Sequence, residues 1–96
     1  MKAMLVARLT DLPNLGKVAT AQLGLAGIDT PDELRRIGSV AAAVRLVELG
    51  IDVCSSKLAS LEGAIRGVRW HSIPAEERAT LRERFETSLA ILHQRK

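Results

Sequence analysis

Apolar residues recur at helical spacing through most of the chain, and glycine or proline interrupts each run. A first short helix without a good cap is predicted over residues 2–9. A second is predicted over residues 15–26, and Gly27 after it is typical of a left-handed helix end. The predicted inner face of the second helix holds Leu15, Val18, Ala19, Leu23 and Ala26.

The clearest helix start lies at Thr30. Its hydroxyl can accept a hydrogen bond from the Glu33 amide while the Glu33 carboxylate reaches back, which forms a capping box with proline at the first helical position. This helix is predicted to end at Gly38. Ser39 is predicted to cap a further helix that ends at Gly50. The inner face of that helix is predicted to hold Val40, Val44 and Val47.

Two longer helices fill the second half of the chain. Ser55 or Ser56 is predicted to cap a helix that ends at Gly67, and the longest helix is predicted to have Pro74 at its first position. Their inner faces are predicted to hold Leu58, Leu61 and Ile65 in one helix, and Leu81, Phe85, Leu89 and Leu92 in the other. No segment alternates apolar and polar residues as a strand does. The pattern therefore predicts an all-α, compact bundle of five or six short helices.

The length of 96 residues indicates one domain over residues 1–96, with an N-terminal extension or short helix in 1–11 and a frayed tail in 94–96. Hydrophobic residues make up 47% of the chain and aromatic residues 2%, so the core must be aliphatic. Trp70 is the largest apolar group available to it. We therefore expect structural roles for Trp70, Leu61, Ile65 and Phe85.

The charge and the cysteine content limit the possible partners and the cellular compartment. Fourteen basic against 11 acidic residues give a net charge of +3, which permits DNA binding without requiring it. The single cysteine, Cys54, excludes an internal disulfide, fits a reducing compartment and is expected to be a partly buried thiol. No apolar run approaches the roughly 18 residues of a transmembrane helix. We expect a cytoplasmic protein without a membrane partner.

Few residues could take part in catalysis or in metal binding. His71 and His93 lack partners at metal-ligand spacing, and Cys54 has no base nearby in the sequence. The predicted pairing of Glu62 with Arg66 indicates an ordinary low pKa for that carboxyl group. No phosphate-loop or dinucleotide-binding pattern is present. The sequence predicts no enzyme activity, no cofactor, no metal and no small-molecule substrate.

The segment "LPNLGK", residues 12–17, admits two interpretations. Asn14 and Gly16 tolerate a positive φ, so the segment can simply turn the chain. Unpaired amides around Gly16 and Lys17 could instead hold a phosphate at a helix start, and Arg35 and Arg36 could join that contact or merely complement the dipole of their own helix. The segment resembles the helix-hairpin-helix motif of DNA-repair proteins, which grips a backbone phosphate. Asn14 replaces the first glycine of that motif, where its side chain would obstruct the phosphate.

A longer pattern is more specific. "LPNLG", "AGIDTPDELRRIGSV", "LASLEGAIRGVRW", "IP" and "EERATL" follow in this order between Leu12 and Leu81. The pattern resembles the C-terminal domain of the TfoX (Sxy) family, which regulates competence and natural DNA transformation in bacteria. The resemblance implies a helix-hairpin-helix or SAM-like domain. Family members carry an N-terminal domain ahead of it, so we expect a stand-alone copy here.

Two modes of action remain open at this point. The favoured one is contact with a protein, either a transcription regulator or a second copy in a homodimer. The long C-terminal helix, where Ala90 and Ile91 widen the apolar stripe, is the expected contact. The alternative is weak, sequence-nonspecific binding to the backbone of double-stranded DNA through residues 12–17.

Overall fold

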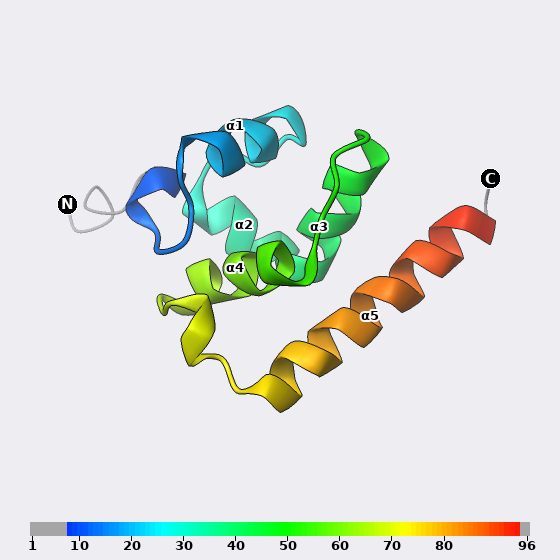
Figure 1. The fold of residues 1–96 in the computed structure, drawn as a ribbon. Coiled ribbons are helices and arrows are strands. Elements are labelled where there is room, and N and C mark those ends of the chain that lie inside the picture. The colour runs from blue at the N-terminus through cyan, green and yellow to red at the C-terminus, as the bar shows by residue number, and fades with distance from the viewer. Residues whose placement is uncertain (1–7, 95–96) are drawn as a thin grey trace.

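The computed structural model describes residues 8–94, which form five α-helices and two short 3-10 turns (Figure 1). In chain order these are η2 (Leu9–Asp11), α1 (Lys17–Leu25), α2 (Pro31–Ile37), α3 (Ser39–Glu48), α4 (Ser55–Arg66), η3 (Trp70–Ser72) and α5 (Ala75–Gln94). No strand occurs between residues 8 and 94, so the predicted all-α class is confirmed. Most of the helix predicted over 2–9 lies outside the described residues. Gln94, predicted to belong to a frayed tail, ends α5.

Three helices end in the same glycine motif. The glycines are Gly27, Gly50 and Gly67, with φ of 82°, 84° and 78°. In each case the amide after the glycine bonds to a carbonyl five residues earlier. These bonds join Ile28 to Leu23 at 2.8 Å, Ile51 to Leu46 at 3.0 Å and Val68 to Gly63 at 2.9 Å. This is the Schellman arrangement, which satisfies the last carbonyls of a helix, and it confirms the three predicted ends.

The start of α2 is also as predicted. The Glu33 amide donates to the Thr30 hydroxyl at 3.2 Å, and the Glu33 carboxylate accepts from the Thr30 amide at 3.1 Å. The same carboxylate accepts from the Asp29 amide at 2.8 Å, and this bond is the main reason that the pKa of Glu33 is lowered. The predicted capping box is therefore confirmed, with one more donor than the sequence indicated.

Three other predicted helix starts are wrong by one or two residues. Gly38, at φ 89°, precedes α3, so Ser39 is its first helical residue rather than its cap. Cys54 occupies the cap position of α4 in place of Ser55 or Ser56. Pro74 lies just before α5, where its carbonyl accepts the first helical bond from the Arg78 amide at 3.0 Å.

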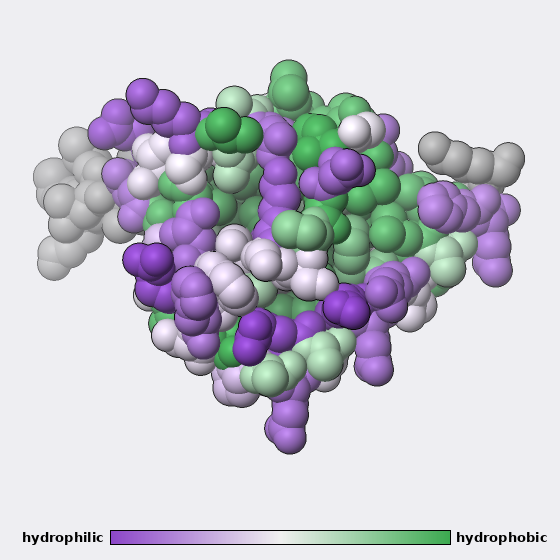
Figure 2. All heavy atoms as spheres, in the orientation of Figure 1, coloured by the Kyte–Doolittle hydropathy of each residue, from purple (hydrophilic) through white to green (hydrophobic). Residues whose placement is uncertain are grey.

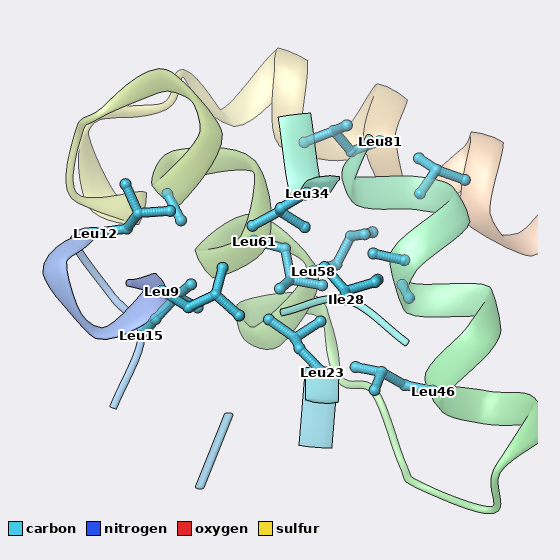
Figure 3. Packing of buried hydrophobic residues seen from close by; sticks show 14 of the residues in the cluster. Leu9, Leu12, Leu15, Leu23, Ile28, Leu34, Leu46, Leu58, Leu61 and Leu81 are labelled. Carbon is cyan, nitrogen blue, oxygen red and sulfur yellow. The ribbon is translucent and has the colours of Figure 1, made fainter. Parts of the chain in front are cut away.

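The core is aliphatic, as the composition predicts. Leucine side chains from every α-helix meet in one cluster, with α4 in its middle (Figures 1 and 3). The most deeply buried large side chains are Leu9, Leu23, Ile28, Leu34, Leu46, Leu61 and Ile73. Phe85 is the single aromatic member of this cluster in residues 8–94. Helix α5 packs against α3 and α4, and α2 packs against the same two helices.

A polar chain of contacts joins α3, α4 and α5 beside this core. The buried Ser39 hydroxyl donates to the Glu62 carboxylate at 2.7 Å, which explains why Ser39 does not cap α3. Arg66 bonds to Glu62 at 2.7 Å and to Glu77 at 2.6 Å. Burial acts to raise the pKa of Glu62, but the bonds from Ser39 and Arg66 outweigh it and lower the pKa. Glu62 is thus a structural carboxylate, as its predicted pairing with Arg66 indicated.

Candidate interaction site

The turn over residues 12–17 is anchored by Leu12 and Leu15, which are both buried in the core. Asn14 adopts a positive φ of 72°, so it reverses the chain. Gly16 does not share that role, because its φ is −100° and it precedes α1 as the cap residue. Gly16 therefore does not use the positive φ that glycine tolerates. A Cβ at this position would meet nothing within 4 Å, so the fold does not require glycine there.

The side chain of Asn14 points into the molecule. Its Nδ2 donates to the Val68 carbonyl at 2.9 Å and to the Ser60 carbonyl at 3.4 Å, and its Oδ1 accepts from the Trp70 amide at 3.2 Å. Asn14 therefore fastens the turn to α4 and η3. The expectation that this side chain obstructs a phosphate at the turn is not met, because its polar atoms are engaged on the inner side.

The start of α1 resembles an anion site only in part. Gly16 is the cap residue of α1, and among the described residues no side chain caps this helix start. Lys17, the first residue of the helix, is exposed. The amides of the first turn are thus available to a ligand. Arg35 is engaged locally by a bond to Asp32 at 3.2 Å, and Arg36 helps to lower the pKa of Glu33. Both arginines complement the carboxyl end of α2, which is the simpler of their two predicted roles.

The outer face of α1 is apolar. Val18 and Leu25 are 70% and 73% exposed, and Ala21 between them is also exposed. These three positions follow i, i+3, i+7 spacing and so share one side of the helix. Figure 2 shows hydrophobic side chains over α1 and, next to it, over α3. We call Val18, Ala21 and Leu25 the α1 ridge.

The prediction that Val18 faces inward is wrong. Leu23 is fully buried, and Val18 lies five positions before it, which is about 140° away around the helix. Lys57 of α4 donates to Gln22, and this bond ties α1 to α4. The sequence does indicate that α1 exposes apolar residues, because Lys17 is its sole charged residue and apolar residues occur on all sides of the helix.

Trp70 is not a core residue. It lies half-buried in η3, with its ring stacked on His71 at a centroid distance of 4.0 Å and the Arg78 guanidinium 5.6 Å from its centroid. Leu61 and Phe85 are buried in the core, and Ile65 packs against it. Cys54 is exposed, which corrects the expectation of a partly buried thiol.

The predicted contact residues of α5 are open to solvent. Ile91 is 51% exposed and Ala90 is exposed beside it. Across residues 8–94 no cluster of histidine, cysteine and acidic side chains could hold a metal ion. In the same range no helix is long and apolar enough to cross a bilayer.

Comparison with known proteins gives a family and two structural relatives. The sequence matches the TfoX C-terminal domain over residues 6–85. An uncharacterised protein from Listeria monocytogenes, solved in a triclinic form, is 44% identical, with a TM-score of 0.79 over 88% of this chain and 94% of its own. A protein of unknown function from the same organism, in a tetragonal form, is 41% identical, with a TM-score of 0.75 over 81% and 96%. No curated protein matches the sequence.

Proposed function

The chain belongs to the TfoX C-terminal domain family, and from this premise we propose that it is a non-enzymatic cytoplasmic module that regulates competence by binding another protein. The partner in this proposal is a transcription regulator or a second copy of the chain. Support for a regulatory role comes from the family pattern between Leu12 and Leu81. Support for protein contact comes from the α1 ridge.

The α1 ridge is the observation that carries the proposal. Val18 and Leu25 are large apolar side chains that α1 presents to solvent. They would contribute to the stability of a complex if a partner removed them from water. Burying a side chain of this size contributes about 1.5–3 kcal/mol. An apolar face without charge is typical of a surface that another protein covers. The α1 ridge therefore suits a partner helix with its own apolar face.

Charge on the α1 ridge is expected to abolish the regulatory effect. In the host that encodes the chain, the gene is deleted and restored as the natural form or as the double variant Val18→Glu, Leu25→Glu. The natural form should restore the transformation frequency, whereas the double variant should restore less than about a tenth of it, because a buried glutamate would cost the partner contact more than 1.4 kcal/mol. Sedimentation velocity on both purified proteins shows whether the partner is a second copy.

Ile91→Glu is the matched comparison, because it adds the same charge at an exposed apolar residue of α5. Ile91 is less exposed, at 51%, than Val18 and Leu25, so the proposal places the contact on the α1 ridge instead of the α5 surface that the sequence favoured, and Ile91→Glu should behave like the natural chain. Loss of function in Ile91→Glu alone would move the contact surface to α5. A transformation frequency that does not respond to the deletion would contradict a role in competence.

DNA binding at the turn remains the second candidate function, and one observation favours it. Asn14 is directed inward, so the open first turn of α1 and the exposed Lys17 are accessible to a backbone phosphate. Such a contact would position the domain on DNA without reading its sequence.

Direct DNA contact is tested by fluorescence anisotropy of a labelled duplex of about 20 base pairs at several salt concentrations. If the turn binds a phosphate, the logarithm of the affinity should fall with the logarithm of the salt concentration by about 0.9 for each phosphate contacted. Lys17→Glu should remove about one such contact. Gly16→Val should block the phosphate without straining the fold, because nothing lies within 4 Å of a Cβ there. Absence of binding at low salt would leave residues 12–17 as a turn alone.

A further inference from the structure

A groove of about 600 Å³ lies on the surface where α4, η3 and α5 meet. Its walls are the first turn of α4, the tryptophan of η3 and the first three turns of α5. The side chains that line it from α5 form two rows at i, i+4 spacing. One row is Ala75, Ala79 and Glu83, and the other is Arg78, Arg82 and Glu86.

One end of the groove is positive and partly apolar. Arg78 is held in place by a bond from its Nε to the Ile73 carbonyl at 3.1 Å and lies over the Trp70 ring. Arg82 donates to the Ser55 hydroxyl at 3.1 Å across the groove. Trp70, Ala75 and Ala79 are apolar residues that line the groove together with these arginines. A carboxylate with an adjacent apolar side chain fits this end.

The other end of the groove is acidic. Glu86 forms an ion pair with Arg82, with 3.7 Å between Glu86 Oε2 and Arg82 Nε. Glu83 lines the groove one turn after Ala79. Two arginines and two glutamates make the lining neutral overall. A nucleic-acid backbone would bring a phosphate to the glutamates as well as to the arginines, so like charges would oppose it. A ligand that carries both an anionic and a cationic group matches both ends.

We propose that this groove binds a protein segment in which an acidic residue is followed, about four residues later, by a basic one. The spacing follows from α5, because Arg78 and Glu86 are eight residues, or about 12 Å, apart along the helix. An extended chain covers that length in about four residues. The proposal rests on the proposed function, since it names a second surface through which the domain contacts proteins.

Trp70 makes the test direct, because it is the single tryptophan of the chain and lines the groove. Its fluorescence is followed while the natural protein is titrated with the blocked peptide acetyl-Asp-Leu-Ala-Ala-Lys-amide. We expect a saturable change. Arg78→Gln, Arg82→Gln and Glu86→Gln should each weaken binding about three- to fivefold, which is the upper part of the range for exposed ion pairs. Arg35→Gln, on α2, is the matched control and should bind as the natural protein does.

Three results would overturn the proposal. These are no saturable change, equal affinity for the uncharged peptide acetyl-Asn-Leu-Ala-Ala-Gln-amide, and the same response to inorganic phosphate or duplex DNA. Circular dichroism of each variant shows whether the fold is kept. The double variant Val18→Glu, Leu25→Glu should bind the peptide normally. If the peptide fails while that variant still lowers transformation, the groove is refuted and the proposed function stands.

Discussion

Gly63→Ala is expected to lower the free energy of unfolding by about 3 kcal/mol, the upper range for overpacking. A Cβ on Gly63 would lie 2.6 Å from the Val68 carbonyl oxygen and 2.6 Å from Asn14 Nδ2. The Val68 carbonyl cannot move away easily, because the Val68 amide is bonded to Gly63 at 2.9 Å. The extra methyl group would therefore disturb both the end of α4 and the Asn14 bonds.

Urea unfolding of the purified domain measures this change. Gly24→Ala is the control, because Gly24 is also within a helix but a Cβ there would meet only the Asp29 carboxylate at an ordinary 3.5 Å. That variant should gain about 0.5–1 kcal/mol from the higher helix propensity of alanine. Equal stability of Gly63→Ala and the natural domain would show that Gly63 is not in close contact with Val68 and Asn14.

Asn14→Asp is expected to destabilise the domain by about 2 kcal/mol, even though the side chains have the same shape. The aspartate could still accept from the Trp70 amide. Its second oxygen, however, would replace the Nδ2 donor and face the Val68 and Ser60 carbonyls, which also bear negative charge. A repulsive contact would thus replace two hydrogen bonds.

Asn14→Gly distinguishes the contribution of the side-chain bonds to stability from that of the backbone conformation. Glycine accepts the positive φ of 72° without strain, so this variant should lose only the three side-chain bonds, about 1.5 kcal/mol at about 0.5 kcal/mol each. The expected order of stability by thermal or urea unfolding is asparagine, then glycine, then aspartate. If glycine is equal to asparagine, the side-chain bonds of Asn14 contribute nothing to stability.

Local signals explain what the sequence predicts well. The capping box at Thr30 and the ends at Gly27, Gly50 and Gly67 depend on bonds within a few residues, so the residue types alone indicate them. The aliphatic core follows from composition in the same way. Family membership also was predictable, because its pattern extends over most of the chain.

The interaction surfaces depend on contacts between distant segments. Asn14 finds its partners 46 to 56 residues away, and Ser39 finds Glu62 23 residues away, so no local pattern indicates either bond. Val18 was expected to face inward because the helix was predicted to begin at Leu15, whose place on the inner face brought Val18 with it. The helix begins two residues later, at Lys17. The size of Trp70 favours a place in the core, whereas the core cluster consists mainly of leucines such as Leu61 and does not include Trp70.

The Schellman ends of α1, α3 and α4 also bear on the rate of folding. Each end is fixed by a bond across five residues, so the residue at which each helix ends is set by local contacts. Little chain has to be searched before such contacts form, and domains built mainly from local contacts fold on a scale of microseconds to milliseconds. The slower step is then the joining of distant segments, for which the Asn14 bonds to the α4–η3 region are the longest-range example among the side-chain hydrogen bonds described.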